Sequence, residues 1–196
     1  MRTMCIVLAV CAMSSGAVAD IIFTVPDAEV SPTDTILSLV VTGMSTVDNQ
    51  GLTGFNAKFD IAGPPGCTFT GAQKPPEANY ILPGGGVPAS GNVINAGRSI
   101  EEIADVVFDP PFPVLPASAT RDVVQLDFAF SGIALGDVFT ISFDAASTND
   151  TNFYDDLGYD IFGVYGTGTI TVTPEPATMS VLALGGLVLI RRRRRA

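Results

Sequence analysis

Residues 121–144 read RDVVQLDFAFSGIALGDVFTISFD, and this stretch decides the fold class. Apolar side chains recur at every second position in two windows, 124–130 and 138–144, with mostly polar or small residues between them. Successive side chains of a strand point to opposite faces of a sheet. Each window therefore predicts an antiparallel strand with one buried face and one wet face. The residues between them, 131–137, contain two glycines and one aspartate and predict a turn.

The same pattern extends outward along the chain. Residues 55–61 (FNAKFDI) and 168–172 (GTITV) alternate in the same way, and the evenly apolar residues 36–41 predict a central strand. Connections rich in Gly, Pro, Asn and Asp separate these windows, which together predict a single antiparallel β-sandwich over residues 20–173. One window is ambiguous: residues 99–102 (SIEE) fit the capping box of a short helix, and a strand through 103–108 fits equally well.

Composition narrows the classes of function. Between residues 20 and 173 there are four basic and 19 acidic residues, a net charge of −15. Such a body is not expected to bind nucleic acid or an anionic membrane surface. The chain has no histidine, so a Ser-His-Asp triad, a Cys-His pair and a histidine metal ligand are all excluded.

The first residues predict export. Arg2 precedes an apolar run over residues 4–13, and Ala17 and Ala19 form a small-residue cleavage site. Residues 1–19 are therefore predicted to be a signal peptide, and the alternative is a buried first strand. Removal of this peptide would leave Cys67 as the only cysteine, which predicts a small buried apolar residue rather than a disulfide.

The last residues predict a membrane segment that stops translocation. The uncharged run over residues 177–190 would form a helix of about 21 Å at about 1.5 Å per residue. Five arginines follow it and are expected to stay in the cytoplasm: Arg191, Arg192, Arg193, Arg194 and Arg195. The acidic body would then lie outside the cell.

The triplet Pro174, Glu175 and Pro176 directly precedes this run. Triplet, apolar span and arginine cluster occur in fixed order at the C-terminus, and residues 174–196 resemble the PEP-CTERM sorting signal of bacterial exported proteins. The resemblance implies recognition of the triplet by exosortase, a membrane peptidase, which would cut near it and release or transfer the body. Two prolines disfavour a helix and leave an extended segment that a peptidase cleft could hold. The alternative is a permanent tail anchor that is never cut.

A second resemblance concerns the body. The order of GLTGFNAKFDI, VVQLDFAFSG, DVFTISFDAAS and GTGTITV is similar to that of cohesin-like domains, a jelly-roll sandwich related in shape to some carbohydrate-binding modules. The resemblance covers roughly residues 21–61 and 121–172. Residues 62–120 depart from it and are rich in proline and glycine.

One loop is dense in the oxygen ligands that Ca²⁺ prefers. Residues 149–160 read NDTNFYDDLGYD, and the candidate ligands are Asp150, Asn152, Asp155 and Asp156. Their spacing is not that of an EF-hand, and an acidic loop between two strands is the alternative. The four tyrosines could line a strip for sugars, although packing in or beside the core is the simpler interpretation.

Together these patterns predict a non-enzymatic exported protein at the bacterial cell surface or in the extracellular matrix, anchored in the membrane only before processing. Its expected partners are exosortase and either a surface protein or an exopolysaccharide, and no cofactor except Ca²⁺ is indicated. A carbohydrate-binding module for extracellular polysaccharide is the first competing hypothesis. A hydrolase that relies on carboxylates alone is the second, and a purely structural matrix component is the third.

Overall fold

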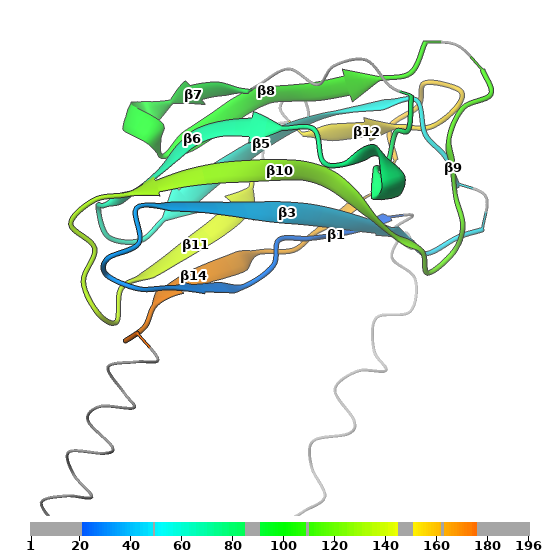
Figure 1. Cartoon of the computed structure of the whole chain (residues 1–196). Helices are drawn as coiled ribbons and strands as arrows, with labels where there is room; N and C mark the ends of the chain where they lie inside the picture. Colours follow the sequence, from blue (N-terminus) through cyan, green and yellow to red (C-terminus); the bar gives the residue numbers. More distant parts are fainter. Residues whose placement is uncertain are drawn as a thin grey trace, which may run out of the picture.

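The computed structural model describes residues 21–48, 50–84, 91–108, 110–144, 151–161 and 163–175. Two twisted β-sheets face each other and enclose one apolar core (Figure 1). Almost all regular structure in the described residues is strand, as the alternating windows predict.

The first sheet has the strand order β13-β1-β3-β10-β6. Its strands are β13 (Gly163–Tyr165), β1 (Ile21–Thr24), β3 (Ile36–Ser45), β10 (Thr120–Phe130) and β6 (Cys67–Gln73). The evenly apolar window forms β3, which lies in the middle of this sheet between β1 and β10. All of these pairs are antiparallel except β1 with β13.

The second sheet has the strand order β2-β14-β11-β5-β8-β7. Its strands are β2 (Ala28–Val30), β14 (Gly168–Val172), β11 (Val138–Phe143), β5 (Gly54–Ala62), β8 (Ser99–Val106) and β7 (Asn92–Ile94). A further strand, β12 (Asn152–Tyr154), pairs with the first residues of β5, beyond the point where β11 ends. Only β2 with β14 is parallel.

Four smaller elements complete the described structure. The strands β4 (Gln50–Gly51) and β9 (Val114–Leu115) pair at one end of the sandwich. Single 3-10 turns form η1 (Glu77–Asn79) and η2 (Asn95–Gly97).

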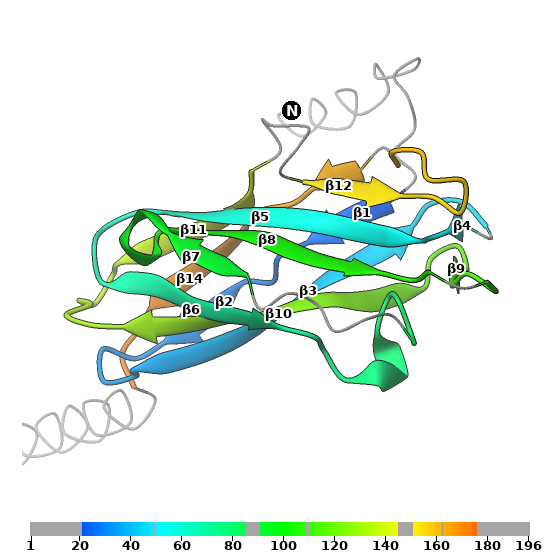
Figure 2. The same cartoon turned by 90° about the horizontal axis from the view of Figure 1, so that it is seen from above.

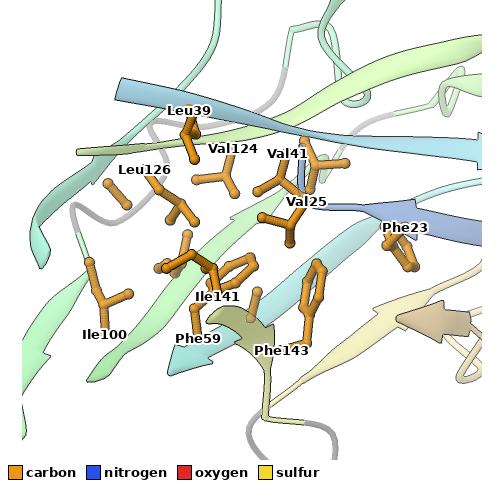
Figure 3. Packing of buried hydrophobic residues seen from close by; sticks show 14 of the residues in the cluster. Phe23, Val25, Leu39, Val41, Phe59, Ile100, Val124, Leu126, Ile141 and Phe143 are labelled. Atoms are coloured by element: carbon orange, nitrogen blue, oxygen red, sulfur yellow. The ribbon is translucent and has the colours of Figure 1, made fainter. Parts of the chain in front are cut away.

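The core is made by the apolar positions that alternate along the strands. In β5 the side chains of Phe55, Ala57, Phe59 and Ile61 are buried, whereas the intervening polar side chains are only half-buried. Figure 3 shows Phe59 of the second sheet below Val41, Val124 and Leu126 of the first. The ring centroids of Phe59 and Phe143 are 4.3 Å apart, so aromatic packing adds to the burial of apolar area.

The ambiguous window forms a strand, and the expectation of a short helix at residues 99–102 is wrong. These residues begin β8, in which Ile100 and Ile103 both face the core. Both can do so at a spacing of three because the register with β5 shifts between Ala57 and Phe59. Glu102 has a φ of 59° at this irregularity, which is a left-handed conformation that no helix would accept.

Cys67 is fully buried, as predicted. Burial raises the pKa of its thiol to about 12, and the positive charge of Arg98 offsets only part of this effect. Because the thiolate is the reactive form, we expect no reaction of the native mature chain with a thiol reagent at pH 8. Labelling monitored by mass should reach one thiol per chain only after denaturation. Rapid labelling without denaturant would contradict the buried position.

Some predictions fall outside the described residues. They concern the signal peptide with Ala17 and Ala19, residues 177–190 with the five arginines, and the residues Pro176 and Asp150. Within the described ranges, the structure contains no helix with the length and apolar character needed to cross a bilayer.

Candidate functional site

An open hollow of about 710 Å³ lies over the second sheet, where β12, β5 and β8 run side by side (Figure 2). The alternation of side chains along each strand decides which residues line it. Phe55 and Ala57 face the core, so Asn56 between them faces outward. Outward residues of the neighbouring strands complete the lining, among them Ala104 and Tyr154.

The border of the hollow is apolar and exposed. Phe108 lines it just after the end of β8, with 80% of its surface exposed. Gly158 lines it from the β12 side, and its neighbours Leu157 and Tyr159 are 75% and 68% exposed. Large apolar side chains exposed together around a concavity are typical of a binding surface.

The hollow also contains two carboxylates of different character. Glu102 is exposed, whereas Asp105 is buried and already occupied by the protein's own donors. The buried Tyr80 hydroxyl donates to Asp105 Oδ2 at 2.6 Å, and the Val106 N–H donates to Oδ1 at 2.8 Å. A carboxylate with both oxygens hydrogen-bonded inside the fold ties β8 to the loop carrying Tyr80, which is a structural role.

All four basic residues of the body are engaged within it. Lys58 forms an ion pair with Asp144 at 3.0 Å, and Lys74 lies 4.8 Å from the centre of the Tyr80 ring. Arg98 donates to the backbone carbonyls of residues 63, 64 and 67, and Arg121 donates to Asn79 Oδ1 at 2.9 Å. The remaining acidic side chains therefore make the surface potential negative, and a negative surface favours neutral or basic ligands.

The structure gives different surroundings to the three predicted calcium ligands that it describes. Asn152 lies in β12. Asp155 Oδ1 accepts the N–H groups of Leu157 and Tyr159 at 2.9 and 2.8 Å, so it closes the loop. The Asp156 side chain lies directly against Gly51. In the described part of the chain, no three acidic or cysteine side chains gather as a metal site would require, and the calcium site stays a prediction.

The four tyrosines do not form one strip. Tyr80 is 2% exposed, and the Tyr165 ring stacks 5.4 Å from the ring of Phe23 beside the core. Tyr154 lines the hollow together with the exposed Phe108, and the exposed Tyr159 directly follows the lining residue Gly158. The hollow therefore brings together Tyr154 and Phe108, which come from segments that are distant in the sequence.

The sorting segment begins directly at the end of β14, beside the edge strand β2 of the second sheet. Strand β14 ends at Val172, and the Thr173 N–H donates to the carbonyl of Val30 on the parallel strand β2 at 2.8 Å. Two residues later, Glu175 Oε1 accepts a hydrogen bond of 2.7 Å from the Thr33 hydroxyl. Contacts with the body thus continue into the predicted recognition triplet.

Residues 172–195 match the family of the PEP-CTERM protein-sorting motif. The chain carries a PEP-CTERM motif at its C-terminus. This finding confirms the resemblance seen in the triplet, the apolar span and the arginine cluster. A search of the curated proteins found no match to the chain.

The body matches solved cohesin structures in fold. A cohesin module of a family 33 glycoside hydrolase from Clostridium perfringens has a TM-score of 0.57 at 8% identity, covering 81% of this chain and 100% of that one. The third cohesin of ScaC from Acetivibrio cellulolyticus, described in complex with the ScaB dockerin, has a TM-score of 0.55 at 14% identity, covering 78% and 99%. A non-cellulosomal cohesin from Archaeoglobus fulgidus has a TM-score of 0.54 at 10% identity, covering 83% and 97%. The body is therefore a two-sheet, cohesin-like sandwich.

Sequence patterns alone missed two features. Phe108 and Glu102 come from the stretch that departs from the cohesin-like pattern, and no periodicity places them beside Tyr154. Ser31 and Thr33 read only as polar residues of a turn. No local pattern relates them to the carboxylate of Glu175, which lies 142 residues after Thr33.

Proposed function

We propose that this protein is a non-enzymatic interaction protein, exported through its signal peptide and sorted to the cell surface or extracellular matrix through its PEP-CTERM motif. In this proposal Pro174, Glu175 and Pro176 are read by an exosortase-type peptidase. The segment over residues 177–190 anchors the precursor in the membrane, with the arginines on the cytoplasmic side. The jelly-roll body is the part that remains outside.

The observation that carries the proposal is the direct succession of body and motif. The motif starts at Val172, the last residue of β14, so no linker separates the sandwich from its sorting segment. Four residues, 173–176, lie between β14 and the apolar run, and about 3.3 Å per extended residue gives them a reach of roughly 13 Å. A body held this close to the membrane before cleavage fits cargo that is processed at the membrane face.

The intact mass of the extracellular protein tests this sorting. We expect a chain that begins at Asp20 and ends near the triplet, without residues 177–196. An extracellular chain that retains the arginines, or one found only in the cytoplasm, would refute the proposal.

For the body we propose protein binding at the hollow between β12, β5 and β8. Relatives of this fold are described in complex with dockerins, which makes a dockerin-like protein module the first candidate partner. The hollow offers exposed apolar side chains on an acidic body whose basic residues are engaged. Its partner should therefore present an apolar anchor flanked by basic residues.

Substitution of Phe108 tests the binding surface. Phe108→Ala should weaken binding of the purified partner about tenfold or more, because it removes the largest exposed apolar side chain at the hollow. Isothermal titration calorimetry measures the affinity. Ile36→Ala is the matched control, since Ile36 is also exposed, at 77%, but lies in β3 of the other sheet. Equal affinities of wild type and Phe108→Ala would rule out this surface.

A second candidate is binding of extracellular polysaccharide at the same hollow. It is favoured by the aromatic side chains of Tyr154 and Phe108 in the lining, because sugar rings pack on aromatic faces, and by the exposed Tyr159 next to the lining residue Gly158. Titration with the producer's own purified polysaccharide separates the two candidates. Saturable binding that is lost in Phe108→Ala would favour the sugar over the protein.

A further inference from the structure

The turn between β2 and β3 is built to hold two hydroxyl groups in place. The Ser31 N–H donates to Asp34 Oδ2 at 2.7 Å, and the Asp34 N–H donates back to the Ser31 carbonyl at 3.0 Å. The Thr33 N–H donates to Ser31 Oγ at 3.1 Å. With its backbone closed in this way, the turn fixes the Ser31 and Thr33 hydroxyls 2.7 Å apart.

These hydroxyls contact the central residue of the sorting triplet. Thr33 Oγ1 lies 2.7 Å and Ser31 Oγ 3.3 Å from the same atom, Glu175 Oε1. Each hydroxyl has one proton, so the short contact assigns the Thr33 proton to Glu175. The Ser31 proton is shared between Thr33 and the carboxylate. Thr33 is therefore the principal donor.

The contact depends on the pairing of β2 with β14, which are neighbours in the second sheet. Strands β2 and β14 pair in parallel, with Val30 opposite Val172 (Figure 2 labels both strands). The Thr173 N–H extends this pairing to the Val30 carbonyl, and the Thr173 hydroxyl lies 3.4 Å from Glu29 Oε2. This pairing carries Glu175 over the turn, although Ser31 and Glu175 are 144 residues apart in sequence.

We infer that Ser31 and Thr33 form a clasp that positions the sorting triplet for the peptidase. The inference rests on the proposed sorting function. Pro174 and Glu175 are exposed, so the clasp orients these two residues without covering them. A segment already held extended loses less conformational entropy on entering a cleft than a free chain does, and this lowers the KM for cleavage. Ser31 and Thr33 are positioning residues in this reaction and take no part in its chemistry.

Cleavage of the full-length precursor in membranes that contain the peptidase tests the clasp. Thr33→Val keeps the shape of the side chain and removes the hydroxyl. It should raise the KM about three- to tenfold and leave kcat unchanged, the effect of one charge-assisted hydrogen bond. Ser31→Ala should have a smaller effect. Thr33→Ser should restore most of the wild-type KM, which a purely structural role for the threonine methyl group would not allow.

Two controls complete the experiment. Thr120→Val makes the same change at an exposed position at the far end of β10 and should leave the KM unchanged. A peptide of residues 172–196 has no turn to bind and should show a raised KM, close to that of the Thr33→Val precursor. Thermal unfolding of each variant excludes general loss of the fold.

The outcomes are distinct. An unchanged or lowered KM in Thr33→Val overturns the clasp, and so does a peptide cleaved with the KM of the wild-type precursor. A lowered KM would mean that the turn masks the triplet instead of presenting it. A wild-type precursor that is not cleaved at all refutes the sorting proposal itself, and the clasp with it.

Discussion

Replacement of Pro174, Glu175 and Pro176 by alanine is expected to stop processing and leave the chain as a membrane-bound precursor. Alanine is the best helix former, whereas each proline disfavours a helix at its own and the preceding position. The apolar helix expected over residues 177–190 could then continue toward β14, and the carboxylate of Glu175 would be lost. Cell fractionation with immunodetection measures the ratio of precursor to extracellular protein.

The chain contains a control of matched composition. Pro75, Pro76 and Glu77 also combine two prolines with one glutamate, in the loop before and at the start of η1. Their replacement by alanine should leave processing at the wild-type level. Release of the triplet variant in wild-type amounts would show that the triplet is not the recognition element.

The variant Phe59→Ala should lose about 3–5 kcal/mol of unfolding free energy, a large part of the stability of a domain of this size. Phe59 is fully buried in the middle of β5, where its ring contacts Phe143 of the neighbouring strand. The substitution removes this packing and leaves a cavity between two rigid sheets that cannot close on it. Urea denaturation of the mature chain, followed by far-UV circular dichroism, measures the change.

Phe108→Ala is the control for this measurement, because it deletes the same atoms from a side chain that is 80% exposed. Its unfolding free energy should stay within about 0.5 kcal/mol of the wild type. Similar losses in both variants would mean that Phe59 does not occupy the core of the folded protein.

The strands were largely predictable because they are local in origin. In β10, Val124, Leu126, Phe128 and Phe130 are buried as the alternation predicts. The burial of Val123 beside Val124 was not predictable, because it depends on the shift in register against β3 between Asp122 and Val124. The same reason explains why the helix expected at residues 99–102 is wrong. The irregularity at Glu102 lets Ile100 and Ile103 face the core at a spacing of three, so the alternation that marks a strand is absent from the sequence there.

The candidate sites were less predictable from the sequence than the strands. The sequence shows that Tyr154 is aromatic, but it does not show its neighbours in the hollow. These are Phe108 and residues of β5 and β8. The composition of its loop makes Asp155 a candidate calcium ligand. In the structure its Oδ1 accepts hydrogen bonds from two backbone N–H groups of its own loop. Composition shows which atoms are available, and only the fold shows which of them are already hydrogen-bonded within the protein.

The sequence by itself determined the all-β class and the PEP-CTERM motif. Both depend on neighbouring residues: a period of two in the strands, and a fixed order of triplet, apolar span and arginines at the chain end. The tertiary structure decided that β2 lies beside β14, and therefore that Thr33 meets Glu175. This contact joins segments near opposite ends of the chain. It depends on the parallel pairing of β2 with β14, a long-range pairing that no local pattern in the sequence encodes.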